Sequence, residues 1–161
     1  MNIKIIQADY LSEKHQQEIP EMLDHYASDP MGGGQALAEH VKQSLVTELA
    51  KRPHAFSIIS YVDGVAAGLI NCFEVFSTFQ CKPIINIHDV VVLSAYRGHG
   101  LSQKMLEKVE QLAREKGCCK ITLEVLSKNE IAKSAYHKFG FTGYELDPEA
   151  GTAQFWEKPL H

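Results

Sequence analysis

The chain of 161 residues is 45% hydrophobic and 22% charged, which is typical of a single soluble globular domain with a sizeable core. Its formal net charge of −4 argues against a nucleic-acid-binding protein with a broad basic face. No apolar run is long enough to span a bilayer, and the N-terminus lacks the pattern of a signal peptide.

Cysteine spacing gives no sign of a metal site or a disulfide framework. The four cysteines include the adjacent pair Cys118 and Cys119, and no C-x-x-C motif occurs. We therefore expect reduced, buried thiols, no metal, and a cytoplasmic protein without nucleic-acid or membrane partners.

The first half of the chain predicts one strand and two helices. Alternating apolar and polar residues indicate a strand over residues 2–8. Ser12 is expected to cap a helix that reaches about residue 27, and the glycine-rich residues 29–34 must end it. A second helix is predicted over residues 35–51, where apolar residues recur at every fourth position.

The second half alternates strands and helices. Asp63-Gly64 predicts a hairpin turn between strands at residues 54–61 and 65–79, and Lys82-Pro83 is interpreted as another turn. The remaining predicted elements are, in order, a strand at 84–93, an amphipathic helix at 101–116, a strand at 121–126, a helix at 129–139, and closing strands at 141–144 and 152–157. This order indicates a mixed α/β sheet with helices on both faces, in one domain over residues 1–161.

The most informative stretch is an apolar strand that runs into a glycine turn and then directly into a helix. The turn consists of Arg97-Gly98-His99-Gly100-Leu101-Ser102. Helix N-termini present unpaired N–H groups, and glycine lets the backbone approach an anion closely. The turn lacks the lysine of a P-loop and the third glycine of a dinucleotide fold. Taken alone, these residues fit a phosphate-binding turn and an ordinary tight turn about equally.

Two motifs resemble the GNAT acetyltransferase superfamily. The run from Arg97 to Ser102 is similar to the Q/R-x-x-G-x-G/A signature, with serine at the last position in place of glycine or alanine. Residues 129–141 resemble the N-x-x-A-x-x-x-Y-x-x-x-G-F segment, and the two motifs occur in the expected order and separation. The resemblance implies a single-domain GNAT-like mixed, mostly antiparallel twisted sheet and an acetyl-CoA-dependent N-acetyltransferase.

The resemblance also implies where acetyl-CoA binds. The pyrophosphate is expected beside Arg97 on the backbone amides of Gly98, His99, Gly100, Leu101 and Ser102. The pantetheine arm is expected to pair, as a strand would, with Val90, Val91 and Val92, where an N–H near Val92 holds the thioester oxygen.

Two residues of the last helix match family residues with known roles. Tyr136 matches the tyrosine that protonates the leaving thiolate, and it also fits a packing role beneath the sheet. Asn129 resembles the asparagine that bonds the pantetheine or a nearby backbone group, and it also fits a helix N-cap.

Three residues are candidates for the base that takes the proton of the amine. Glu124 lies at a position that resembles the base of some ribosomal-protein acetyltransferases, and it also fits a carboxylate paired with a lysine. His88 and Asp89 lie on the strand that reaches the cofactor, and regular alternation would place them on opposite faces. We place this pair slightly ahead of Glu124.

The acceptor is expected to be a small primary amine such as a polyamine, an amino acid or a xenobiotic. The stretch from Phe76 to Asp89 weakly resembles diamine (spermidine/spermine-type) acetyltransferases, although His88 replaces the first residue of their acidic pair. The loop from Asp29 to Gly34 fits either a lid over the substrate or a flexible connector. The alternatives are a protein lysine or N-terminal acetyltransferase and a non-catalytic CoA-binding module. The resemblance implies a homodimer.

Overall fold

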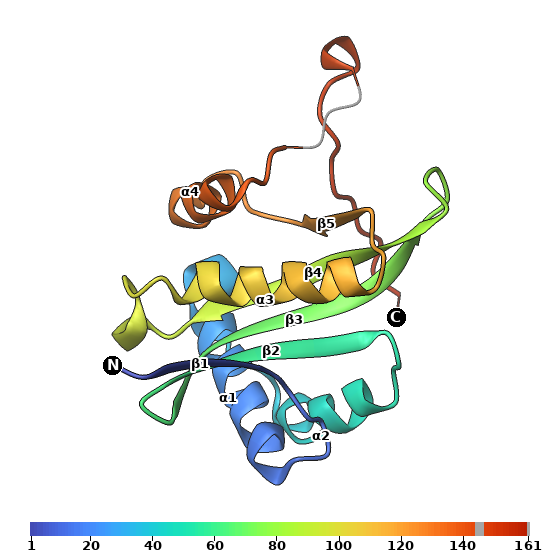
Figure 1. Cartoon of the computed structure of the whole chain (residues 1–161). Coiled ribbons are helices and arrows are strands. Elements are labelled where there is room, and N and C mark those ends of the chain that lie inside the picture. The colour runs from blue at the N-terminus through green and yellow to red at the C-terminus, as the bar shows by residue number, and fades with distance from the viewer. Residues whose placement is uncertain (144–146, 161) are drawn as a thin grey trace.

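The computed structural model describes residues 1–143 and 147–160. In these residues one sheet has the strand order β1-β2-β3-β4-β5 (Figure 1). The strands are β1 (Ile3–Gln7), β2 (Ala55–Val62), β3 (Val65–Ser77), β4 (Lys82–Val92) and β5 (Lys120–Leu123). Neighbouring strands are antiparallel except for β4 and β5, which are parallel. The predicted mixed, mostly antiparallel sheet is confirmed.

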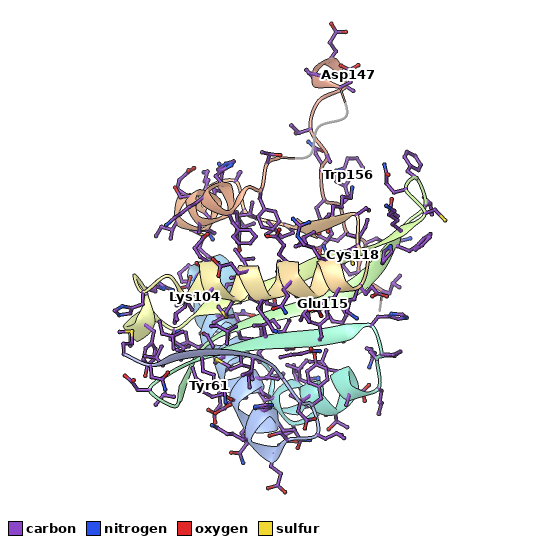
Figure 2. All side chains as sticks on the ribbon, in the orientation of Figure 1. Tyr61, Lys104, Glu115, Cys118, Asp147 and Trp156 are labelled. Atoms are coloured by element: carbon purple, nitrogen blue, oxygen red, sulfur yellow. The ribbon has the colours of Figure 1, made fainter. Side chains whose placement is uncertain are left out.

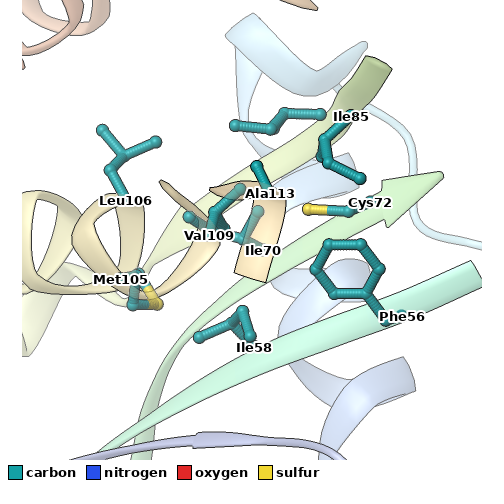
Figure 3. Packing of buried hydrophobic residues seen from close by; sticks show 10 residues of the cluster. Phe56, Ile58, Ile70, Cys72, Ile85, Met105, Leu106, Val109 and Ala113 are labelled. Atoms are coloured by element: carbon teal, nitrogen blue, oxygen red, sulfur yellow. The ribbon is translucent and has the colours of Figure 1, made fainter. Parts of the chain in front are cut away.

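Helices cover both faces of this sheet, as predicted (Figure 1). The helices are α1 (Glu13–Ser28), α2 (Glu39–Ala50), α3 (Leu101–Glu115) and α4 (Glu130–Phe139). On one face, Ile58 and Ile70 pack with Met105 and Val109 of α3 (Figure 3). On the other face, neighbouring sheet residues such as Ile59 pack with Ile19 of α1. Because helices cover both faces, residues 56–62 of β2 and 67–72 of β3 are buried continuously rather than at every second position.

The β2–β3 hairpin turn is confirmed, but the second predicted turn is wrong. Asp63 and Gly64 have φ angles of 48° and 83°, which suits the type I′ hairpin. Lys82 and Pro83 lie inside β4 and pair with the end of β3. The turn comes one step earlier, where Cys81 has a φ of 50°. Proline is tolerated there because it is near the start of the strand.

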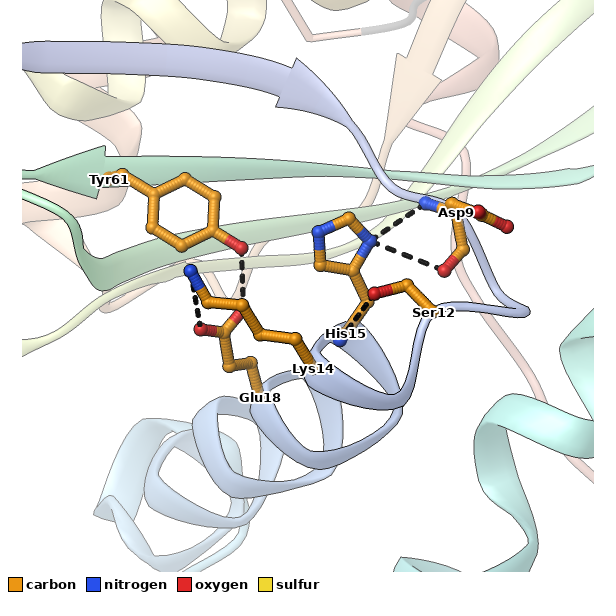
Figure 4. Close-up of polar contacts among 6 residues, drawn as sticks. All are labelled: Asp9, Ser12, Lys14, His15, Glu18 and Tyr61. Carbon is orange, nitrogen blue, oxygen red and sulfur yellow. Dashed lines mark hydrogen bonds and ion pairs between the residues drawn. The ribbon is translucent and has the colours of Figure 1, made fainter.

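The start of α1 is fixed as predicted, whereas α2 begins later than predicted. Ser12 caps α1 by accepting a hydrogen bond from the N–H of His15, and Tyr61 of β2 donates to Glu18 on the next turn (Figure 4). Residues 35–38 are not helical because Leu37 N–H donates to the Asp24 carboxylate at 2.7 Å instead. A side-chain acceptor on α1 therefore competes with the first turn of the helix.

The predicted closing strands are not formed. Residues 141–143 have no strand pairing, residue 144 lies outside the described residues, and residues 152–157 are also unpaired. The side chains of Phe155 and Trp156 are 73% and 83% exposed, and the chain returns from Asp147 past Trp156 toward the sheet without joining it (Figures 1 and 2). A strand needs a neighbour to bond with, and β5 pairs only with β4 in the described residues.

Candidate active site

The two halves of β4 have different neighbours. Residues Ile84–Ile87, here called the closed half, pair with β3 on one side and with all of β5 on the other. Residues Asp89–Val92, called the open half, pair with β3 alone among the described residues. The edge of the open half that faces away from β3 is therefore free of a strand partner.

A bulge at His88 separates the two halves. Asn71 is opposite Asp89, but the next residue on β3, Cys72, is opposite Ile87, so His88 is an extra residue without a partner. A bulge of this kind bends a strand and increases its twist. The side chain of His88 is exposed, and its ring contacts Phe73 edge-on with 4.8 Å between centroids.

The backbone of the open half presents hydrogen-bonding groups away from β3. Leu93 N–H donates to Ala67 O on the β3 side at 2.9 Å. Backbone groups alternate along a strand, so the N–H groups of Val90 and Val92 point the other way. Consistently, the carbonyl of Val92 accepts from Arg97 Nε at 3.4 Å. Val91 is 2% exposed and anchors this half in the core beneath α1.

The glycine turn follows the open half directly and opens α3. Gly98 and Gly100 have φ angles of 84° and 73°, which only glycine adopts freely. No side chain caps the start of α3, so its first N–H groups remain available. Leu101 is 2% exposed and holds the helix start against the sheet, whereas Arg97 and His99 are exposed. This turn suits an anion such as a pyrophosphate.

Helix α4 places Tyr136 near the site. Asn129 caps the helix by accepting from Ala132 N–H at 3.2 Å. Tyr136 is half-buried beside Phe141 and lines a cavity of about 820 Å³ between β5 and α4. Burial, and secondarily the nearby Tyr26, raises the pKa of Tyr136 to about 12. Its phenol therefore remains protonated at neutral pH.

Asp89 and Tyr26 complete the cluster of polar groups at this place. Asn71 Nδ2 donates to Asp89 Oδ2 at 3.0 Å. The pKa of Tyr26, on α1, is raised by burial first and then by the negative charges of Asp89 and Asp29. Tyr26 in turn raises the pKa of Tyr136. The fold therefore brings residues of α1, β4 and α4 within electrostatic range of one another.

The other candidate bases are placed differently. Glu124 follows the last residue of β5 and is exposed. His88 is adjacent to Asp89 but is exposed and contacts Phe73. Of the three candidates, Asp89 is the one that is half-buried within the cluster.

Two residues of the cluster were not identified from the sequence. Tyr26 lies on α1, outside both motifs, so no sequence pattern distinguishes it. Asn71 is 4% exposed within an apolar strand, and a buried polar residue of this kind was the signal that could have revealed it.

The described residues hold neither a cluster of metal ligands nor a membrane-spanning helix. No group of three or more His, Cys, Asp or Glu is arranged to hold a metal ion in residues 1–143 and 147–160. Within the same residues no helix is long and apolar enough to cross a membrane.

The sequence model described as the Acetyltransferase (GNAT) family matches residues 19–141. The matched stretch includes the open half of β4, the glycine turn and α4. The chain belongs to the GNAT acetyltransferase family. The family inferred from the two motifs is thus confirmed, and GNAT acetyltransferases use acetyl-CoA.

Relatives in this family act on different amines. A thialysine N-epsilon-acetyltransferase of Bos taurus is 35% identical over 65 residues, which cover 40% of this chain and 38% of the relative. A streptothricin acetyltransferase of Streptomyces lavendulae is 33% identical over 101 residues, covering 62% of this chain and 51% of the relative. The chain spans less than two thirds of the length of the curated relatives it matches.

A solved GNAT structure confirms the fold. An aminoglycoside N-acetyltransferase in complex with CoA superposes with a TM-score of 0.74 over 99% of this chain and 96% of its own. At 17% identity this likeness concerns the fold and leaves the substrate open.

Proposed function

We propose that this chain transfers an acetyl group from acetyl-CoA to the primary amine of a small molecule. The observation that carries the proposal is the open half of β4, whose free edge runs directly into the glycine turn at the start of α3. An extended ligand that ends in a pyrophosphate matches this arrangement in both shape and charge.

The residues present fit acetyl-CoA in their chemistry. The amides of Gly98–Ser102 and the side chain of Arg97 receive the pyrophosphate, and the open half receives the pantetheine arm. Asn129 uses its Oδ1 as a cap, which leaves its Nδ2 to donate to that arm. Bound acetyl-CoA supplies a thioester whose carbonyl is open to attack by an amine and whose thiolate leaves. The outward N–H of Val92 is placed to stabilise the carbonyl oxygen.

Tyr136 is proposed to be the acid. Its phenol keeps its proton at neutral pH because burial raises its pKa to about 12. As the N–C bond forms and the C–S bond breaks, Tyr136 Oη gives its proton to the sulfur.

Asp89 is proposed to be the base. It takes one proton from the amine, which arrives as an ammonium cation at neutral pH. The nitrogen loses its second proton as the amide forms, and this proton restores the Tyr136 phenol through solvent. Its support is its position, because it is half-buried and close enough for its charge to raise the pKa of Tyr26, which in turn raises that of Tyr136. The carboxylate of Asp29 also raises the pKa of Tyr26. Two negative charges therefore lie near Tyr26, and they favour a cationic amine there. The thialysine and streptothricin relatives favour a small acceptor.

Thermal melting and thiol release test this function. Saturating acetyl-CoA, at about 100 times its Kd, should add about 2.7 kcal/mol of stability and raise the Tm by about 5–10 °C. Arg97→Ala should reduce this shift, whereas Arg114→Ala, a matched arginine at the far end of α3 that pairs with Glu110, should not. CoA-thiol release is then measured with thialysine-like amino acids, diamines, aminoglycosides and a peptide.

The outcomes separate the acceptor classes. Release that saturates with one small amine supports the proposal, and release with the peptide alone replaces the small acceptor by a protein. A Tm that does not move at saturating acetyl-CoA contradicts the proposed cofactor site.

A further inference from the structure

A chain of hydrogen bonds runs across the sheet and ends on Asp89. The hydroxyl of Tyr10, just after β1, lies 2.8 Å from Ser57 Oγ on β2. Ser57 Oγ donates to Asn71 Oδ1 on β3 at 2.7 Å. Asn71 Nδ2 then donates to Asp89 Oδ2 on β4 at 3.0 Å. Side chains from three adjacent strands are thus joined on the face that α1 covers.

The two central members are buried where an apolar residue would pack. Ser57 is 0% exposed and Asn71 is 4% exposed. Their strand neighbours, such as Ile58 and Ile70, belong to the apolar core. Burying an amide or a hydroxyl is unfavourable unless its hydrogen bonds are satisfied, and at best the net gain is small. Stability alone therefore gives little reason for two polar residues at these positions.

The positions of the protons give this chain of hydrogen bonds a direction. A serine hydroxyl has one proton, and that of Ser57 goes to Asn71, so Tyr10 must donate to Ser57. The pKa of Tyr10 is raised by burial, which keeps its phenol a donor. Since Ser57 engages the carbonyl of the Asn71 amide, the NH₂ group of Asn71 faces Asp89. Every bond donates toward Asp89, and an ionised carboxylate is the natural end of such a chain.

We propose that Asn71 is a positioning residue that holds the Asp89 carboxylate aimed at the amine, with Ser57 and Tyr10 fixing the orientation of Asn71. This inference rests on the function proposed above. Asn71 occupies Oδ2 of Asp89, which leaves Oδ1 to take the proton of the amine.

The titratable groups around Asp89 determine which control variants the experiment needs. Tyr26 faces it from α1, Cys72 lies next to Asn71 on β3, and His88 precedes it on β4. Burial, and then the charge of Asp89, raises the pKa of the Cys72 thiol, so the thiol stays protonated. Tyr136, on α4, is linked to this group through Tyr26, which raises the pKa of Tyr136. Among these groups His88 is the alternative base, and histidine is the residue type that titrates near neutral pH.

The pH dependence of kcat/KM tests the inference. Asn71→Ala should lower kcat about tenfold, as expected for loss of one hydrogen bond to a charged group, with KM for acetyl-CoA unchanged. Its acid-side fall in kcat/KM should move to higher pH, because the carboxylate that takes the proton of the amine loses a hydrogen-bond donor. Asn71→Asp, which has the same shape, should move the fall further because a second carboxylate would lie beside Asp89.

Ser57→Ala and Tyr10→Phe give milder variants in case the Asn71 variants fold poorly. Ser57→Ala should move the acid-side fall in the same direction by less, and Tyr10→Phe by less again, because each leaves the Asn71 donor in place. His88→Gln should leave the position of the fall unchanged.

The results distinguish a positioning role of Asn71 from a merely structural role and from His88 as the base. Lower activity with an unmoved pH profile in the Asn71 and Ser57 variants means that the chain is merely structural, and the inference fails while the proposed function stands. A profile that moves in His88→Gln instead assigns the base to His88. If no amine increases thiol release by the wild-type protein, the proposed function and this inference fail together.

Discussion

The closed and open halves of β4 belong to one strand but meet different surroundings. Ile84–Ile87 bond to a strand on each side, and their isoleucine side chains are buried. Among the described residues the open half bonds to β3 alone, and it runs directly into the glycine turn at the start of α3. A strand that is held by one neighbouring strand and by packing beneath it therefore leaves its second edge available to a ligand.

The largest expected effect is that of Val92→Pro in the open half. Proline removes the N–H proposed to hold the thioester oxygen, and loss of one such donor typically lowers kcat by about 100- to 1,000-fold. The N–H of Val92 points away from β3, so the strand pairing should survive. Circular dichroism and kcat at saturating substrates measure the two effects.

The matched control is Val91→Pro, one residue earlier in the same half. The N–H of Val91 points toward β3, so this change removes a bond of the sheet and should impair folding itself. A Val92→Pro protein with full activity, or a Val91→Pro protein as stable as the wild type, would break the distinction between the two edges.

In the closed half we expect a loss of stability without a loss of chemistry. Ile85 is 0% exposed in the core beneath α3, and Ile85→Ala should cost about 2–5 kcal/mol of unfolding free energy. Activity per folded molecule should stay near that of the wild type. Urea denaturation and active-site-normalised rates check this, and a specific loss of kcat would show that the closed half shares in catalysis.

Removal of the proposed acid should affect kcat selectively. Tyr136→Phe should lower kcat about 100-fold, within the range of general acid catalysis, and leave KM for acetyl-CoA unchanged. Phe139→Leu, on the same helix and packed against the same core, controls for altered packing of α4. An unchanged kcat in Tyr136→Phe removes this residue from the mechanism.

The smallest expected effect concerns stability at alkaline pH. The pKa of Tyr136 rises from its ordinary value of 10.0 to about 12 in the fold. Between these pH values the folded state binds more protons than the unfolded state, so stability falls as pH rises. The slope from this residue is at most about 1.4 kcal/mol per pH unit, and Tyr136→Phe should remove it. Tyr10 and Tyr26, whose pKa values are also raised, retain part of the slope. Equal slopes in both proteins would contradict a buried phenol.

Local features of the site could be predicted from the sequence. The glycine turn and the cap at Asn129 depend on backbone conformations and hydrogen bonds within a few residues, so the motif and the geometry agree. The family followed from two such local motifs in the correct order.

Features that depend on register could not be predicted. The approach of Asn71 to Asp89 requires the bulge at His88, which has no distinct sequence signal, and Tyr26 is brought in by the packing of α1. The closing strands failed for a related reason, because alternation at residues 152–157 indicates a strand only if a neighbour is present. The single domain, the homodimer and the cytoplasmic location stay predictions.

Amide hydrogen exchange at the three valines of the open half tests whether acetyl-CoA pairs with the edge that faces away from β3. Exchange is measured by NMR for Val90, Val91 and Val92 with and without saturating acetyl-CoA. We predict that Val91 is protected in both conditions, whereas Val90 and Val92 exchange freely alone and become protected with acetyl-CoA. Unchanged exchange at Val90 and Val92 with the cofactor bound would contradict the account.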